Sequence, residues 1–282
     1  MMPAIVRHVG RHSNLGDTQL AVAHSVVDIA AAYRHIPVHP DIAQRLRYRI
    51  GDCTLADARA PMGAAGSASV MQTLLEAALH ALRARHPSVL SFGYLDDVLL
   101  IGASRSILPA YRDLLDLLAR LHLPPSLPKL QHPAYSAVFL GFRADMEISP
   151  AAGREVGYLA ITPQRQEALL HHIRRADRHL RRKPWRRSLT CLRSLAGKLK
   201  HAASVFPGAR GWVRNLFGLI ALGDEDADST RASPHRAHAL RRNVLAELAA
   251  WRTALRRAHA SGQRIPFPRP WTPPRLRRPT SS

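Results

Sequence analysis

The stretch from Ser91 to Ile101 constrains the fold most, because it joins two apolar segments through the adjacent carboxylates Asp96 and Asp97. Two short apolar segments that meet at a tight polar junction predict a buried β-hairpin. Unpaired buried carboxylates are strongly unfavourable, and a divalent cation such as Mg²⁺ would offset this, since it prefers carboxylate oxygens. The alternative interpretation is a plain hairpin turn, in which Asp is common.

A second carboxylate, Asp28, ends another apolar, strand-like segment that begins near Val26. One carboxylate from each of two neighbouring strands can hold a pair of metal ions roughly 3.5–4 Å apart, the arrangement used for in-line phosphoryl displacement. We therefore expect Asp28 and Asp96 to approach closely enough for one ion to contact both.

Several motifs follow one another in a fixed order along the chain. They are Asp28 with Tyr33 five residues later, a Pro-x-Gly segment at 61–63, Tyr-x-Asp-Asp at 94–97, Lys129 in a Pro-rich loop, and a Leu-Gly pair within 139–142. In this order and spacing they resemble the catalytic motifs of reverse transcriptases. The resemblance extends over about residues 20–260 and is closest to retrotransposons of the LTR-like and tyrosine-recombinase types.

The resemblance implies an RNA-directed DNA polymerase that transfers nucleotides from dNTPs to a primer 3′-hydroxyl with two Mg²⁺ or Mn²⁺ ions. Asp28 and Asp96 would ligate the metals with help from the Ile29 carbonyl, and Asp97 would complete the catalytic carboxylates. Tyr33 would exclude a ribose 2′-hydroxyl, unless it is an ordinary core tyrosine. The other implied substrate-binding residues are Gly63, Gly66, Tyr94 and Lys129. The alternative interpretation of Lys129 is an ordinary surface lysine. The implied primer grip is Phe139, Leu140, Gly141 and Phe142.

The composition predicts a polyanionic partner. Lys and Arg number 41 against 20 Asp and Glu, which gives a net charge of +21. Such an excess usually indicates nucleic acid, here a primed RNA or DNA template, although Arg-rich codon usage in a GC-rich genome would also contribute. The candidate nucleic-acid-binding residues are Arg174, Arg175, Arg178, Arg181, Arg182, Lys183, Arg186 and Arg187. The alternative for this run is a solvated helix face.

Apolar spacing predicts an α+β fold with an antiparallel palm, two packed helices and a helical thumb or connection. We expect residues 1–24 to be a poorly structured remnant of the fingers, 25–150 the palm, 151–261 the helical thumb, and 262–282 a disordered Pro/Arg-rich tail. In the palm, a turn at 51–52 separates weak strands. The expected palm helix stripes are Val70, Leu74, Ala78, Leu82 and Leu108, Tyr111, Leu115, Leu118.

Three helix starts predict thumb helices: Thr162-Pro163, Ser188 and Ser233-Pro234. The apolar stripes that follow them are Leu169, Ile173, Ala176, Leu180, then Leu192, Leu195, Leu199, and then Leu240, Val244, Leu248, Trp251, Leu255. A further helix is expected through Val213, Leu216, Phe217 and Ile220.

The remaining features exclude other classes. Two distant cysteines, Cys53 and Cys191, imply neither a disulfide framework nor a zinc quartet. No apolar run approaches the ~18 residues of a membrane span, and no signal peptide is evident. We therefore expect an intracellular protein, cytoplasmic or nuclear, with no membrane partner. No second acidic cluster follows the thumb, so we expect no RNase H domain.

A second hypothesis is a catalytically inactive retroelement fragment that binds nucleic acid only through its charge. Only 27 residues precede Asp28, where reverse transcriptases carry a long fingers region. The sequence also departs from the family pattern at Ala31, where an acid is common, at Ala68, where Pro is usual, and at Met71, where Phe is frequent. Primer extension with Mg²⁺ or Mn²⁺ separates the two hypotheses.

Overall fold

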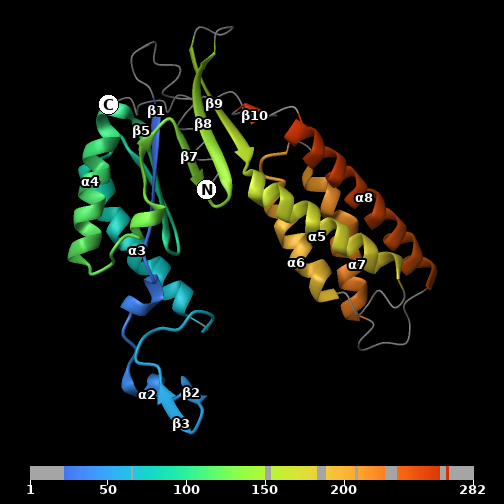
Figure 1. Cartoon of the computed structure of the whole chain (residues 1–282), viewed down its shortest axis with the longest axis horizontal. Helices are drawn as coiled ribbons and strands as arrows, with labels where there is room; N and C mark the ends of the chain where they lie inside the picture. Colours follow the sequence, from blue (N-terminus) through green and yellow to red (C-terminus); the bar gives the residue numbers. More distant parts are fainter. Residues whose placement is uncertain are drawn as a thin grey trace, which may run out of the picture. The chain divides into compact units, whose positions relative to one another are not determined.

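The chain divides into two compact units. Unit 1 comprises residues 1–140, 144–157 and 267–282, and unit 2 comprises 141–143 and 158–266. The computed structural model describes residues 22–64, 66–149, 154–182, 189–206, 209–225, 234–260 and 265–266. Figure 1 shows strands with covering helices in unit 1 and a group of helices in unit 2.

A four-stranded sheet with the order β4-β5-β1-β6 forms the centre of unit 1. Its strands are β1 (Val22–Asp28), β4 (Leu90–Tyr94), β5 (Asp97–Ala103) and β6 (Gln131–Ala134). β1 runs antiparallel to β5, in register from Val22 opposite Ala103 to Asp28 opposite Asp97. β4 and β5 form the predicted hairpin, with Tyr94 opposite Asp97.

The start of β1 corrects the expectation of an unstructured lead-in up to residue 24. Residues 22–24 are buried members of the strand, because their backbone pairs with β5 and their side chains fill both faces of the sheet. The rest of the predicted lead-in, residues 1–21, lies outside the described residues.

Two helices, α3 (Ser67–Arg85) and α4 (Ser104–Arg120), pack on one face of this sheet. Both helices were predicted, but their buried faces differ in part from the predicted stripes. On α3, the buried apolar residues are Met71, Leu75, Ala78, Leu79 and Leu82, whereas Val70 is 52% exposed. On α4, Leu108 is 42% exposed and Leu114 is buried instead. Each helix carries more apolar residues than the sheet covers, so spacing alone does not identify the covered face.

The opposite face of the main sheet packs against residues of two strands, β7 and β8. A second sheet has the order β10-β9-β8-β7, from β7 (Ser136–Phe139), β8 (Phe142–Ser149), β9 (Arg154–Ile161) and β10 (Ile265–Pro266). Ala137, Phe139 and Met146 pack there against residues of β1 and β5.

Strands β9 and β10 are corrections to the sequence prediction. Residues 154–161 were expected in the helical region, but Gly157, Leu159 and Ile161 are buried in alternation with less buried neighbours, which is the period of a strand. Ile265 and Pro266 were expected in the disordered tail, but they pair with Leu159 and Tyr158. Residues 267–282 of that tail lie outside the described residues.

Unit 2 contains α5 (Pro163–Arg181), α6 (Leu189–Ala202), the short 3-10 helix η4 (Ala209–Val213), α7 (Arg214–Glu225) and α8 (Pro234–Ala260). The predicted stripes of α5, α6 and α8 are confirmed by the burial of Leu169, Ile173, Ala176, Leu180, Leu192, Leu195, Leu199, Val244, Leu248, Trp251 and Leu255. Leu240, the other residue of the predicted α8 stripe, is only partly buried. In α7, Leu216 and Ile220 are buried, whereas Phe217 is 43% exposed. Thr162 is the N-cap of α5 as predicted, and Ser188 and Ser233 fall outside the described residues.

A small peripheral part of unit 1 follows β1. It comprises η1 (Ala32–His35), α2 (Pro40–Ala43) and a ribbon of β2 (Arg47–Ile50) and β3 (Cys53–Ala56). The ribbon confirms the predicted turn, with Gly51 in the left-handed region at φ 57°. In Figure 1 the ribbon lies away from the main sheet of unit 1. None of the helices in the described ranges combines the length and apolarity needed to cross a membrane.

Candidate active site

Three carboxylates gather at one end of the main sheet of unit 1. Asp28 is the last residue of β1, Asp97 is the first residue of β5, and the two are direct partners across the strands. Asp96 occupies the turn that precedes Asp97, and its carbonyl oxygen accepts a hydrogen bond of 2.8 Å from the Ile29 N–H. The antiparallel register therefore brings together residues that are about 70 positions apart in the sequence.

The turn that presents Asp96 is a two-residue β-hairpin turn made by Leu95 and Asp96. Leu95 has φ 58°, in the left-handed region that residues with a Cβ rarely adopt. Two-residue hairpin turns require positive φ at one or both central positions and usually use Gly or Asn. The surrounding structure must therefore hold Leu95 in this conformation.

Burial and the neighbouring negative charges act together on Asp97. Burial, followed by the charges of Asp96 and Asp28 and a hydrogen bond with Asp28, raises the pKa of Asp97 to about 6, against the opposing effect of Lys129. The Lys129 Nζ lies 2.9 Å from the Asp28 Oδ2. This hydrogen bond and the negative charge of Asp28 raise the pKa of Lys129. The end of the sheet thus concentrates negative charge beside the cation of Lys129.

A cavity of about 610 Å³ opens beside these carboxylates. This volume falls within the roughly 300–1,000 Å³ of small-molecule sites. Its lining residues are Asp28, Ile29, Ala30, Ala31, Ala32, Tyr33, Arg34, Asp57, Pro61, Met62, Asp96, Ser126 and Lys129. Five residues predicted for the site therefore line one cavity: Asp28, Ile29, Tyr33, Asp96 and Lys129.

Tyr33 lies in η1 and packs partly against the core of unit 1. Burial raises the pKa of its hydroxyl, and the neighbouring charge of Asp96 and Tyr94 raises it further. Tyr33 is thus both a partly buried tyrosine and part of the cavity wall next to Asp96. Tyr94, by contrast, is 51% exposed and is not among the residues that line the cavity.

The Pro-x-Gly segment contributes to the cavity through Pro61 and Met62 rather than through its glycines. Gly63 and Gly66 have φ of 88° and 90°, and a Cβ added at either would meet no heavy atom within 4 Å. Backbone conformation explains why glycine occupies both positions, since only glycine adopts such angles without strain. Gly66 is the N-cap of α3.

The predicted primer grip forms the turn between β7 and β8, with Leu140 and Gly141 at positive φ. Phe139 is buried in the core of unit 1. In unit 2, the ring of Phe142 stacks on His201 at 4.7 Å between centroids, and the Arg165 guanidinium lies 5.1 Å from the Phe142 centroid. Both aromatic rings are therefore occupied by protein contacts, and a role in gripping a primer stays a prediction for the turn itself.

The predicted nucleic-acid-binding arginines of α5 lie on its solvent side. Arg174, Arg175, Arg178, Arg181 and Arg182 are exposed, and Arg181 pairs with Asp177 one turn earlier at 3.0 Å. Lys183, Arg186 and Arg187 lie outside the described residues. Exposure is required for contact with phosphates, but it is equally the property of a solvated helix face.

The chemistry of the side chains supports the prediction of bound metal ions, but their arrangement in the described residues does not form a complete set of metal ligands. Carboxylate oxygens are the ligands that Mg²⁺ prefers, and a cation would relieve the repulsion that raises the pKa of Asp97. However, within the ranges that the structure describes, no group of three or more His, Cys, Asp or Glu residues is arranged to hold a metal ion. The two ions therefore stay a prediction.

Two features of the site were missed in the sequence. Arg34 lines the cavity, and its Nη1 donates to both carboxylate oxygens of Asp57 at 2.7 and 2.6 Å. Its only sequence signal is its place next to Tyr33, because Asp57 is 23 residues away. Gln72 was also missed, and its amide contacts the backbone on both sides of Tyr94.

Comparison with known proteins gives a likeness of fold. No family model matches the sequence, and no curated protein matches it. The chain is similar to the foamy viral protease-reverse transcriptase dRH in complex with double-stranded DNA, with a TM-score of 0.50, 16% identity, and coverage of 87% of this chain and 37% of that one. It is also similar to the foamy viral protease-reverse transcriptase in complex with RNA/DNA hybrid, with a TM-score of 0.50, 18% identity, and coverage of 88% and 28%.

The chain thus spans about a third of the length of these structures. At this identity the likeness concerns the fold alone, and it supports a reverse-transcriptase-like fold that is compatible with the α+β class. This likeness of fold agrees with the motif order noted in the sequence.

Proposed function

We propose that this protein catalyses template-directed DNA synthesis, as a reverse transcriptase of the retroelement kind, with unit 1 as palm and unit 2 as thumb. The observation that carries the proposal is the placement of Asp28 opposite Asp97, with Asp96 in the adjoining turn, at a cavity lined by Tyr33 and Lys129. The fold similarity and the motif order support it.

Asp28 and Asp96, with the Ile29 carbonyl, would hold two Mg²⁺ or Mn²⁺ ions, which lower the pKa of a primer 3′-hydroxyl and neutralise charge on the leaving phosphate. The protein's own residues contribute positioning and charge. Lys129 carries a positive charge beside Asp28, where it can stabilise negative charge that develops on a phosphate in the cavity. Tyr33 forms the wall against which the sugar would lie.

Primer extension on RNA and DNA templates tests the proposal, with Mg²⁺ or Mn²⁺ supplied in turn. Asp28→Asn keeps the shape of the side chain but removes the charge, and we expect extension to fall by about 100-fold or more, the scale of losing one strong transition-state contact. Asp52→Asn is the matched control, because that carboxylate is fully exposed on the β2–β3 ribbon. A wild-type protein that extends no primer with either metal would refute the proposal.

The second candidate function is nucleic-acid binding without catalysis. Two observations favour it: Lys129 already neutralises Asp28, and the described part of the chain holds no assembled group of three metal-ligating side chains. This candidate predicts salt-sensitive binding to primer–template together with no extension. The active-enzyme proposal predicts salt-sensitive binding together with primer extension.

A further inference from the structure

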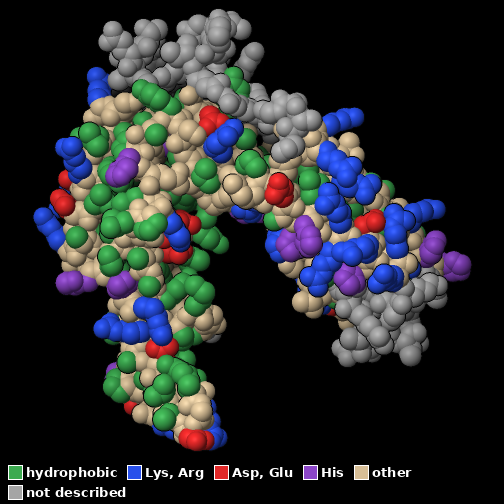
Figure 2. All heavy atoms as spheres, viewed as in Figure 1, with side chains coloured by type: hydrophobic (Ala, Val, Ile, Leu, Met, Phe, Trp, Pro, Cys, Tyr) green, Lys and Arg blue, Asp and Glu red, His purple; other side chains and the backbone are tan. Residues whose placement is uncertain are grey.

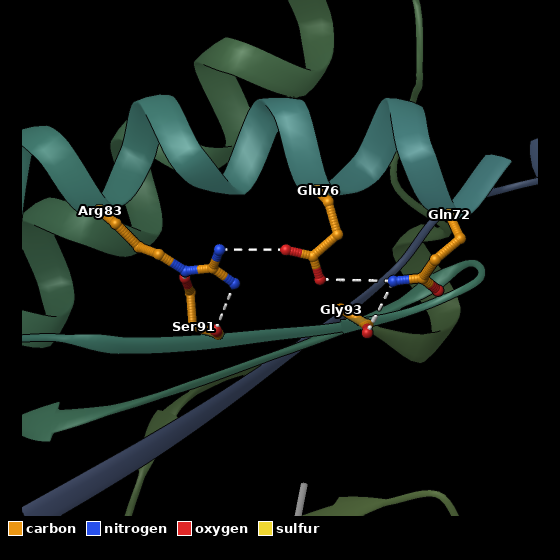
Figure 3. A network of polar contacts seen from close by, with 5 residues as sticks. All are labelled: Gln72, Glu76, Arg83, Ser91 and Gly93. Atoms are coloured by element: carbon orange, nitrogen blue, oxygen red, sulfur yellow. Dashed lines mark hydrogen bonds and ion pairs between the residues drawn. The ribbon is translucent and has the colours of Figure 1, made fainter. Parts of the chain in front are cut away.

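A row of polar side chains on α3 faces the edge strand β4 and the turn that carries Asp96. The row consists of Gln72, Glu76 and Arg83, which project from one side of the helix toward β4 in Figure 3. β4 is the first strand in the order β4-β5-β1-β6, so among the described strands it has a hydrogen-bonded neighbour on one side. The row supplies side-chain partners to this edge strand from the helix above it.

Gln72 contacts the backbone on both sides of Tyr94. Its Oε1 accepts a hydrogen bond of 2.8 Å from the Leu95 N–H, and its Nε2 donates one of 3.2 Å to the Gly93 carbonyl. Leu95 is the turn residue at positive φ, so the Gln72 acceptor acts at the strained position. One amide therefore ties the end of β4 to the first residue of the turn.

The orientation of the Gln72 amide is itself set by its neighbours. The Nε2 also donates to the Glu76 Oε1 at 3.3 Å, and the other Glu76 oxygen pairs with Arg83 at 3.0 Å. Arg83 donates to the Ser91 carbonyl at 2.9 Å and to the Ser91 Oγ at 3.0 Å (Figure 3). Since a carboxylate only accepts, Glu76 directs the NH₂ of Gln72 toward itself and Gly93 and leaves the oxygen for Leu95.

Gly93 allows α3 to approach β4 closely enough for these contacts. A Cβ added at Gly93 would lie 2.7 Å from a methyl of Leu75 and 2.8 Å from a methyl of Leu79. Both leucines are fully buried in the core of unit 1. The helix therefore sits on the strand through Gly93, with Gln72 at the end of the contact nearest the turn.

We propose that Gln72 is a positioning residue that holds the Leu95–Asp96 turn, and through it the carboxylates of Asp96 and Asp97, in the arrangement needed at the site. Its catalytic consequence rests on the proposed polymerase function. Its structural part, the restraint of the turn, does not.

The test compares wild type with Gln72→Met, which keeps side-chain size but has no amide to bond Leu95 or Gly93. Thr73→Ala is the matched control, because Thr73 is exposed on the same helix and its hydroxyl donates to the Ser69 carbonyl within that helix. Two quantities are measured: amide hydrogen exchange of Leu95 by NMR, and kcat and KM for dNTP in primer extension.

For Gln72→Met we expect Leu95 to exchange at least about tenfold faster, with exchange in β1 unchanged, since the bond removed is local. We expect kcat to fall by about 10- to 100-fold with KM changed little, because a small misplacement of reacting groups reduces rate rather than binding. Thr73→Ala should match wild type in both measurements.

Unchanged Leu95 exchange in Gln72→Met would overturn the restraint of the turn. Faster exchange with unchanged kcat would overturn the positioning role. If the wild-type protein extends no primer, the proposed polymerase function fails, and the exchange measurement alone confirms or overturns the restraint.

Discussion

The carboxylate end of unit 1 and the arginine face of α5 in unit 2 carry the two charges that the proposed function needs, and they are built in opposite ways. Asp28, Asp97 and Lys129 come from three separate segments and meet only through strand register and a loop contact. The α5 arginines come from consecutive turns of one helix and stay exposed. Figure 2 shows Lys and Arg side chains gathered over the helices of unit 2 on the face in view.

The difference indicates which part of the protein would attract nucleic acid and which part would carry out catalysis. A helix face made of exposed arginines needs only helical periodicity, and it can attract any polyanion without fixed geometry. A carboxylate whose pKa is raised, as that of Asp97 is, needs burial and specific neighbours, so its site tolerates few changes. Mutations should therefore affect rate in unit 1 and affinity in unit 2.

The largest expected effect is on rate, from Asp96→Asn. We expect primer extension to fall by about 100- to 1,000-fold, the scale of one preorganised electrostatic contact, while affinity for primer–template changes less than about twofold. Extension rates and binding isotherms on the same preparation measure this. Equal losses of rate and affinity would remove the distinction between the two regions.

The next effect is on stability and concerns His24, which is buried in β1 of unit 1. Neither of its ring nitrogens has a hydrogen-bond partner among the residues that the structure describes. Burial lowers its pKa to about 4, against a smaller opposing effect of Asp145. The unfolded chain binds this proton near pH 6.5 but the folded protein does not, so stability is greatest above pH 6.5. It should fall by about 3 kcal/mol between pH 6.5 and 4, at 1.36 kcal/mol per pKa unit.

Urea unfolding at a series of pH values measures this loss. His24→Leu should remove most of the dependence over that range, whereas His171→Leu, at an exposed histidine of α5, should leave it intact. If His24→Leu unfolds with the same pH dependence as wild type, other groups account for the loss.

A third effect concerns affinity and isolates unit 2. Replacing Arg174, Arg175 and Arg178 by Gln should reduce the slope of log affinity against log salt by up to about 3, because each phosphate contact contributes about 0.9. Arg105, Arg112 and Arg120 of α4, replaced together by Gln, are the matched control, since they are exposed and carry the same charge. Equal slope changes in the two triple variants would mean that net charge, not the α5 face, governs binding.

The smallest expected effect is on substrate selection by Tyr33. An aromatic ring in the cavity wall rejects a ribose 2′-hydroxyl by steric clash, so Tyr33→Ala should raise rNTP use relative to dNTP use by about tenfold, the lower end of what a pocket contact discriminates. The ratio of the two kcat/KM values measures it. An unchanged ratio would assign Tyr33 to packing alone.

The sequence was sufficient for features that depend on local pattern. The hairpin at Asp96–Asp97, the Thr162 cap of α5 and the buried stripes of α5, α6 and α8 follow from alternation, helical spacing and capping, and the structure confirms them. The motif order also indicated Asp28, Tyr33 and Lys129, and the structure brings all three to one cavity.

Only the tertiary structure decided which surfaces are covered and which distant polar groups meet. Val70 is exposed and Met71 buried because the sheet covers one side of α3, and residues 154–161 are a strand because neighbouring strands pair with them. The pairs Arg34–Asp57 and Gln72–Leu95 each join residues 23 positions apart. Periodicity operates over a few residues, whereas such contacts depend on how separate elements pack, and the composition of a single segment does not encode that.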